Sequence, residues 1–487
     1  MSAYDRLPCS APLSRRALLT RTANGFGALA AGALFGSTAS AAGVGLDARR
    51  ALDGGGPFTP RAPHFPARAK NVIFLYMDGG PAQMDTFDPK PELARWAGQP
   101  IPVDTPPTQF DNIGTVLPSY WDFKPGGESG LMISDLFPEL RRHADKLCVV
   151  RSMTNKFPEH TAANYLLHTG HNPAGRPSVG AWCAYGLGSE AKNLPGYVVV
   201  DGGLTPPGGI ECYGSGFLSP SYQGSTFRSE GEPVAHARGP HSGTEREAGR
   251  RRLLDALDQR GEERDGSIEA ALNNYELAFR MQSAVPELAD LGAESAATRE
   301  LYGVDAEFKP TATFARQCML ARRLVERGVR FVQVPMVATG HDRWDQHSNL
   351  KKGHTDNARA VDQPVAALLA DLESRGLLES TVVLFAGEFG RTPMAQGGGS
   401  SENRGRDHNP HGFSIWLAGG GFKGGHSFGA TDDFGYFAVD QPVEMHDLHA
   451  TLLHALGLDH TRLTVRFDGR DMRLTDVFGH VQRDWLA

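Results

Sequence analysis

Asn71-Val-Ile-Phe-Leu-Tyr-Met-Asp78-Gly-Gly-Pro-Ala-Gln-Met-Asp85 has the composition of a buried strand that ends in a tight turn. In open α/β folds ligands lie beyond the carboxyl ends of the strands, so Asp78 falls at a candidate site. Gly79 and Gly80 permit a sharp turn and the close approach of a ligand. An Asp at such a turn also often only accepts hydrogen bonds from backbone amides, and for this residue alone both interpretations stay open.

Apolar runs and helical periodicity alternate along the rest of the chain. Strands are expected at about 71–77, 147–151, 329–335, 381–387 and 413–418. Helices are expected at about 161–168, 311–327, 355–375 and 446–456. This alternation predicts an α/β protein with a three-layer α/β/α sandwich and a mostly parallel sheet.

The N-terminus has the features of an export signal. Ser14-Arg-Arg-Ala-Leu-Leu-Thr20 is similar to a twin-arginine motif, a mildly apolar stretch follows, and Ala39-Ser-Ala41 offers a small-residue cleavage site. We therefore expect residues 1–41 to be a signal peptide, with the twin-arginine export machinery as a partner and a periplasmic or extracellular location. The apolar stretch is short and rich in Gly, so no stable membrane span is expected in the mature chain.

The remaining chain is expected to form one elaborated domain. Residues 42–69 would be an extended lead-in, residues 70–487 the domain, and the region around 171–300 a loop and helical insertion. The formal charge of -7 and the pI near 6.2 give no basis for nucleic-acid binding. The cysteines form no CxxC pair, and a disulfide between Cys183 and Cys212 stays open.

Acidic and His residues follow several of the predicted strands, a pattern that indicates a metal site at one edge of the sheet. The candidate ligands are Asp78, Asp342, Asp345, His347, Glu388, His408 and His411. Mixed carboxylate and imidazole ligands suit divalent ions such as Zn or Mn, whereas Mg or Ca is favoured where carboxylates dominate. Arg391 and Arg406 lie among these acids, either to bind an anionic substrate or to balance charge.

Several motifs resemble those of one large uncharacterised family, number 1501 in the series of domains of unknown function, within the alkaline phosphatase and sulfatase superfamily. They are Tyr76-Met-Asp-Gly-Gly80, Trp344-Asp-Gln-His347, Gly387-Glu-Phe-Gly-Arg-Thr-Pro393, Gly405-Arg-Asp-His408, Trp416-Leu-Ala-Gly-Gly-Gly421 and Asp447-Leu-His-Ala-Thr-Leu-Leu453. The resemblance implies an alkaline-phosphatase-like fold. It also implies an exported, metal-dependent hydrolase of phosphate or sulfate esters that acts on an anionic small-molecule or carbohydrate ester. The alternative is a non-catalytic binding or scaffold protein that keeps the fold.

The chain departs from the superfamily pattern at the reaction centre. The position expected for a nucleophile, judged from Thr169-Gly170, is occupied by His160, with Thr161 one place later. These two residues are therefore the catalytic candidates, and the choice between them stays open. Phe389 follows Glu388 where many superfamily members have a second ligand, so the resemblance leaves the number of metal ions open.

Overall fold

The computed structural model describes residues 58–108, 110, 113–231, 233–234, 249, 266–396 and 403–487. The predicted signal peptide lies outside these residues, so twin-arginine export stays a prediction. The described part of the lead-in runs along the domain, where the backbone amide of Arg61 bonds to Leu187 and that of Arg68 to Ala455. None of the helices in the described chain is long and apolar enough to cross a membrane.

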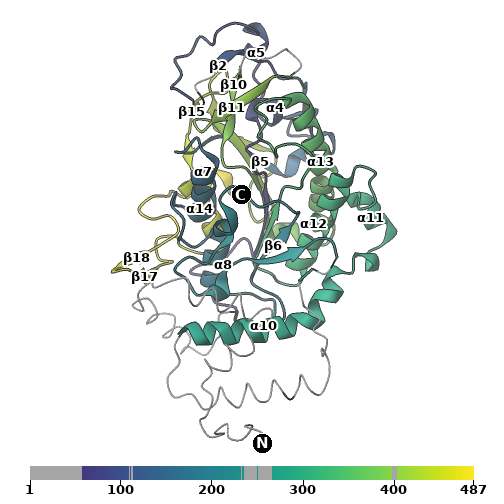
Figure 1. Cartoon of the computed structure of the whole chain (residues 1–487), viewed down its shortest axis with the longest axis vertical. Coiled ribbons are helices and arrows are strands. Elements are labelled where there is room, and N and C mark those ends of the chain that lie inside the picture. The colour runs from purple at the N-terminus through teal and green to yellow at the C-terminus, as the bar shows by residue number, and fades with distance from the viewer. Residues whose placement is uncertain are drawn as a thin grey trace, which may run out of the picture.

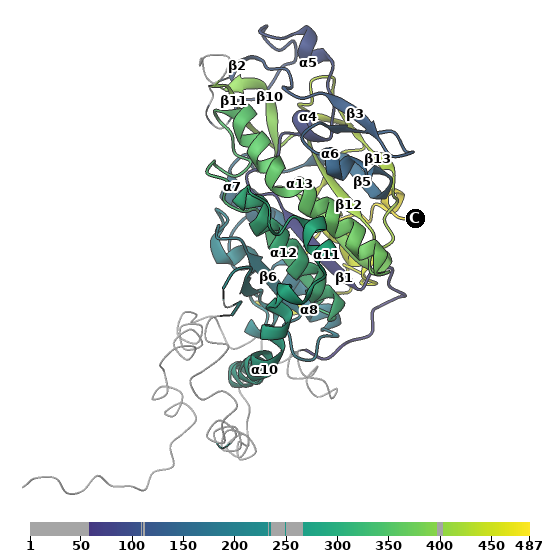
Figure 2. The same ribbon diagram turned by 90° about the vertical axis from the view of Figure 1, so that its right-hand side faces the viewer.

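A nine-stranded sheet forms the middle layer of the protein, with the order β13-β5-β12-β9-β1-β8-β6-β7 and with β16 beside β5 (Figures 1 and 2). The strands are β1 (Asn71–Tyr76), β5 (Leu147–Thr154), β6 (Tyr197–Asp201), β7 (Ser225–Arg228), β8 (Phe331–Pro335), β9 (Thr381–Ala386), β12 (Phe413–Ala418), β13 (His426–Phe428) and β16 (Val443–Glu444). Neighbouring strands are parallel except where β12 runs antiparallel to β5 and β9. The prediction of a mostly parallel sheet is confirmed.

Helices cover both faces of the sheet, as Figure 1 shows. Side chains of β1 alternate between the faces: Val72 and Phe74 join the core under α7, α8 and α14, whereas Ile73 and Leu75 join the core under α12 and α13. Both sets are fully buried, which explains why β1 is a continuous apolar run in the sequence.

The helices begin and end at recognisable signals. Glu159 caps α7 by accepting from two backbone amides, and Gly170 ends this helix in the left-handed conformation with φ 67°. Glu444 and Asp447 form a capping box at the start of α14. The longer helices are α7 (His160–Thr169), α8 (Val179–Leu187), α10 (Gly266–Ala289), α12 (Lys309–Glu326), α13 (Leu350–Ser374) and α14 (Met445–Ala455). The shorter ones are α4 (Gln83–Thr86), α5 (Glu92–Arg95), α6 (Pro138–Arg141) and α11 (Ala296–Tyr302).

Part of the region expected to be a loop and helical insertion forms helices and strands of the central layers. The region 171–228 contributes α8 to one outer layer and β6 and β7 to the central sheet, so this part of the expected insertion belongs to the core. β6 is a five-residue run, too short to be separated from its loop-like surroundings by periodicity. Cys183 and Cys212 are both free, which excludes a disulfide between them here.

A small three-stranded sheet stands beside the carboxyl ends of the central strands. It has the order β11-β10-β2 and consists of β2 (Ile113–Val116), β10 (Gly390–Gln396) and β11 (Gly405–Asn409). The other short strands form pairs: β3 (Phe123–Gly126) with β4 (Leu131–Ser134), β14 (Ala430–Thr431) with β15 (Ala438–Asp440), and β17 (Val465–Phe467) with β18 (Arg470–Met472).

Candidate metal centre

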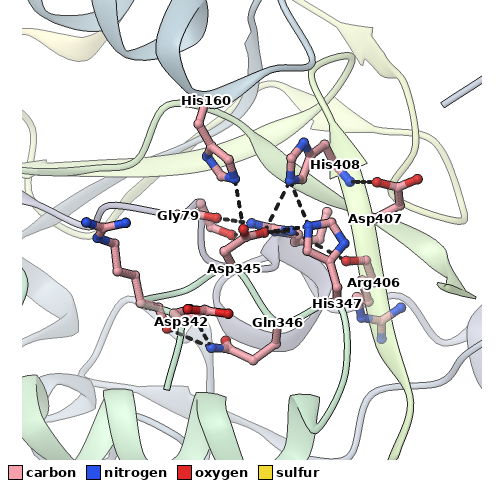
Figure 3. A network of polar contacts seen from close by, with 12 residues as sticks. Gly79, His160, Asp342, Asp345, Gln346, His347, Arg406, Asp407 and His408 are labelled. Atoms are coloured by element: carbon pink, nitrogen blue, oxygen red, sulfur yellow. Dashed lines mark hydrogen bonds and ion pairs between the residues drawn. The ribbon is translucent and has the colours of Figure 1, made fainter. Parts of the chain in front are cut away.

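Residues from five segments meet at the carboxyl edge of the central sheet (Figure 3). β9, β1 and β8 are neighbours, and the chain that leaves their carboxyl ends carries Glu388, Asp78 and Asp345 respectively. His160 is the first residue of α7, and His408 lies on β11. The sheet topology thus brings together residues that are far apart in the sequence.

Asp345 is the centre of this cluster. Its Oδ1 lies 2.9 Å from His347 Nε2, 3.2 Å from His408 Nε2 and 2.6 Å from Arg391 Nη1. Its Oδ2 lies 3.0 Å from His160 Nε2. Every group around this carboxylate is therefore a cation or an imidazole (Figure 3).

Two imidazole nitrogens and one carboxylate oxygen form a compact triangle. His347 Nε2 lies 3.1 Å from His408 Nε2, and both lie near Asp345 Oδ1 at the distances given above. His408 Nδ1 is 2.6 Å from the carbonyl oxygen of Pro158, and His347 Nδ1 contacts the amide oxygen of Gln396. Each Nδ1 faces an oxygen acceptor, so the neutral tautomer with its proton on Nδ1 leaves both Nε2 atoms available to a cation at this position.

This donor set fits a divalent metal ion. Metal–nitrogen bonds of about 2.0–2.1 Å give ligand–ligand separations of about 3.3 Å in a tetrahedral site, and the three edges of the triangle are close to that value. Two imidazoles and a carboxylate suit Zn²⁺ and related ions. The fit has one cost, since an ion here would share Asp345 Oδ1 with the Arg391 guanidinium.

A second carboxylate lies close to the same imidazoles. Ligand atoms of His347, Asp407 and His408 lie within 4.8 Å of one another, as do those of His160, Asp345 and His408. Asp407 is 2 % exposed, and its Oδ2 has no hydrogen-bond partner in the part of the chain that the structure describes. A buried carboxylate oxygen without a donor is costly, which makes Asp407 a further candidate ligand.

Glu388 orients His160. The Glu388 carboxylate is fully buried, and its Oε1 lies 2.6 Å from His160 Nδ1. The backbone amide of Gly79 donates to the same oxygen at 3.0 Å. This arrangement fixes the imidazole ring and directs His160 Nε2 toward Asp345.

Asp78 belongs to a neighbouring network. Its Oδ2 forms an ion pair with Arg343, 2.5 Å from Nε, and its Oδ1 accepts a hydrogen bond from the Tyr76 hydroxyl at 2.9 Å. Burial, followed by repulsion from Glu388 and opposed by Arg343, raises the pKa of Asp78 to about 7. Asp78 and Glu388 are absent from the two ligand groups found among the described residues. Glu388 contacts the cluster through His160, whereas Asp78 is paired with Arg343.

The charges around Asp345 act strongly on the neighbouring side chains. Burial opposes ionisation of Asp345, yet Arg391 and the three imidazoles hold its pKa well below the usual range. Burial also opposes a charge on His160, but hydrogen bonds to Asp345 and Glu388 raise its pKa to about 9. For His408 burial dominates and lowers the pKa to about 4, so this imidazole is neutral at pH 7.

Four of the predicted residues have other surroundings. Asp342 is exposed, and His411 lies outside both ligand groups, with its ring stacked on Tyr436 at 5.7 Å. Arg406 is fully buried in an ion pair with Asp85, so it balances charge and does not face a substrate. The backbone amide of Thr161 donates to the cap residue Glu159 at 2.8 Å, so Thr161 belongs to the N-terminal cap of α7.

The surroundings of Arg391 fit the second of its two predicted roles, the balancing of charge. Its side chain is 0 % exposed, donates to the carbonyl oxygens of Gly79 and Gly80, and meets Asp345. It therefore joins the turn after β1 to the centre of the cluster, and in this structure it is closed off from solvent.

Glycines bring the segments of the site together. A Cβ on Gly405 would lie 2.0 Å from the backbone carbon of His347, and a Cβ on Gly79 would lie 2.8 Å from the backbone nitrogens of Trp344 and Asp345. Gly79 thus admits a neighbouring backbone segment, whereas the sequence suggested the approach of a ligand. Sequence reasoning also missed Arg343 and Asp407, although Asp407 lies within the quoted Gly405-Arg-Asp-His408 motif.

Comparison with known families shows to which family the chain belongs. A family model described as "Protein of unknown function (DUF1501)" matches residues 69–486. The chain belongs to the DUF1501 family. No curated protein matches it. The match begins just before β1 and ends at the penultimate residue, so the whole α/β domain is the family domain.

Solved structures that resemble this DUF1501 protein include hydrolases. The PsFucS1 sulfatase from Pseudoalteromonas sp. has 12% identity and a TM-score of 0.35, with 84% of this chain and 72% of that chain covered. The phosphonate monoester hydrolase SpPMH from Silicibacter pomeroyi has 11% identity and a TM-score of 0.36, with coverage of 86% and 76%. Alkaline phosphatase from the Antarctic bacterium TAB5 has 11% identity and a TM-score of 0.35, with coverage of 81% and 99%.

Proposed function

We propose that this DUF1501 protein is an exported, metal-dependent hydrolase of phosphate or sulfate esters. The observation that carries the proposal is the triangle of Asp345 Oδ1, His347 Nε2 and His408 Nε2, with edges of 2.9, 3.1 and 3.2 Å. Two lone pairs and a carboxylate oxygen that face one point are best explained by a cation between them. The candidate ions are Zn, Mn, Mg and Ca, and the imidazoles favour the first two.

The charge distribution supports an anionic substrate only when a cation is bound. Asp78, Asp345, Glu388 and Asp407 supply four carboxylates at the site, whereas the cationic groups are three: Arg343, Arg391 and a protonated His160. An anionic ester would therefore need additional positive charge. A bound divalent ion supplies that charge and can activate water for attack on the ester.

His160 is the proposed proton donor. Glu388 holds its Nδ1, so the proton that leaves during the reaction is the one on Nε2. Because its pKa is raised to about 9, the imidazole is protonated at neutral pH and can donate to the oxygen of the departing alcohol. Helix α7 begins at this residue, and its N-terminal end favours negative charge on the substrate. Thr161 is the weaker candidate because its backbone amide is bound in the cap by Glu159, whereas the His160 ring contacts Asp345.

The test begins with metal-free protein, which is titrated with Zn²⁺, Mn²⁺, Mg²⁺ and Ca²⁺ while bound metal and turnover of aryl phosphates and aryl sulfates are measured. We expect His347→Ala and His408→Ala to lose metal and turnover together. His160→Gln should keep the metal and lose turnover. His411→Gln is the matched control, because His411 lies outside both ligand groups.

The outcomes separate the possible functions. Metal binding without turnover of any ester would favour a binding or scaffold protein that keeps the fold. Failure to bind any of the four ions would remove the basis for the hydrolase. Equal behaviour of His411→Gln and His408→Ala would show that the triangle is not the metal site.

Export is a separate proposal. It rests on the Arg15-Arg16 pair and on the small-residue site that ends at Ala41. Cell fractionation of the wild type and of R15K/R16K should show loss of the exported form in the variant. Equal export of both proteins would exclude the twin-arginine route.

A further inference from the structure

An exposed aromatic ring stands against the candidate metal ligands. Phe110 is 52% exposed, and its ring is edge-on to those of His347 and His408, with centroid distances of 5.1 and 5.9 Å. Ile113, three residues later, is also an exposed large apolar side chain. Single apolar side chains on a surface need no explanation, but a phenyl ring in contact with two candidate ligands has a defined position relative to the reaction centre.

The strand that follows Phe110 in the chain is paired with a strand of the site. Ile113 begins β2 and is paired with Gln396 of β10. The side chain of Gln396 in turn accepts from His347 Nδ1. Strand β2, which begins at Ile113, is therefore joined through one strand pair to the residue that orients a candidate ligand.

The two arginines of the site are already bound to protein groups, so recognition of the alcohol part of an ester must come from other side chains. Arg391 is closed off from solvent, and Arg343 is bound to Asp78 and to the carbonyl oxygen of Thr205. A phenyl ring such as that of Phe110 offers a flat apolar face, which prefers another ring in stacked or edge-to-face geometry.

We propose that Phe110 forms an apolar subsite that packs against a ring in the alcohol part of the ester. The substrate class is then a phosphate or sulfate ester of a ring-bearing alcohol, either an aryl group or a sugar. This inference rests on the proposed function. It makes Phe110 a specificity-determining residue, with no part in proton transfer or metal binding.

The test compares ligands with and without a ring that share one anionic group. Metal-loaded protein is titrated calorimetrically with phenylphosphonate, glucose 6-phosphate and methylphosphonate, and with inorganic phosphate as the reference. We expect Phe110→Ala to weaken binding of the ring-bearing ligands about threefold to tenfold, the range given by an aromatic contact, while methylphosphonate changes less than twofold. Phe110→Tyr should bind all four ligands as the wild type does.

The matched control is Phe478→Ala. Phe478 is 46% exposed and lies 4.9 Å from the ring of His446, so it is also an exposed Phe on an imidazole, but outside the cluster. A loss with phenylphosphonate alone assigns an aryl group, and a loss that includes glucose 6-phosphate assigns a broader ring class. Equal losses for methylphosphonate and the ring-bearing ligands would overturn the inference while leaving the hydrolase intact. Failure of the wild type to bind inorganic phosphate would overturn both.

Discussion

Replacing Asp85 with Asn removes the charge that faces Arg406 inside the protein. Both side chains are 0% exposed, with Nε–Oδ2 and Nη2–Oδ1 distances of 2.8 and 3.2 Å. Arg406 stays charged in the variant, because a guanidinium does not deprotonate in proteins. Removing one partner of a buried ion pair costs about 3–5 kcal/mol. We therefore expect D85N to lose a large share of a total stability that is typically about 5–15 kcal/mol.

Urea unfolding followed by tryptophan fluorescence measures this loss. The matched control is Glu139→Gln, which removes the partner of Arg142 in a pair of similar length, 2.9 Å, but with side-chain exposures of 73% and 43%. An exposed pair contributes about 0–1 kcal/mol, so the control should unfold at nearly the wild-type urea concentration.

Urea unfolding and phosphate binding of a second variant, R406K, separate the two interpretations of Arg406. If this guanidinium bound substrate, R406K would weaken phosphate binding and leave stability largely unchanged. The structure predicts the opposite, a loss of stability with phosphate affinity of the folded protein retained. A cost below about 1 kcal/mol for D85N would refute the reasoning, because it falls outside the range for a buried pair.

Three further predictions concern other parts of the molecule. Burial lowers the pKa of His168 to about 4, so the stability that the neutral ring contributes is present above its unfolded pKa near 6.5 and is lost as the pH falls through 4. The free energy of unfolding falls by about 3 kcal/mol over this range, and in H168Q it should depend less steeply on pH. Arg322 is 1% exposed and its Nε lies 2.9 Å from Asp371, so R322M should destabilise by about 3 kcal/mol in urea; an unchanged midpoint would contradict this. Thr161→Ala should keep turnover within about twofold if its hydroxyl serves only the cap, and complete loss would instead identify it as the nucleophile.

The sequence was sufficient for the elements with strong local patterns. Apolar runs predicted β1, β8 and β9, and helical periodicity predicted α12 and α13 to within a few residues at most ends. These signals are local, because a fully buried strand needs an apolar side chain at nearly every position. β6 was missed because its five residues lie among Gly- and Pro-rich segments and acquire their strand partners only in the fold.

The site was predictable in part for the same reason. Asp345 and His347 follow the predicted strand at 329–335 and His408 precedes the one at 413–418, so the expectation that such segments meet at one sheet edge placed them together. The sequence could not separate His408 from His411, because the distinction depends on where β11 ends and where Tyr436 lies. Nor could it show that Arg391 is closed off from solvent, since its partners lie at distant positions in the chain.

The order in which the site residues occur has a consequence for synthesis of the protein. Gly79 follows β1, whereas His408 lies on β11, so the cluster spans most of the chain. Contacts between such distant segments form late, after the loops between them have closed. A nascent or truncated chain that ends before β11 has no His408 and therefore lacks one of the proposed metal ligands. Retention of a divalent ion after challenge with a chelator would therefore distinguish fully folded molecules from incomplete ones. Because the ion would bind only the completed fold, it would also stabilise that fold against unfolding.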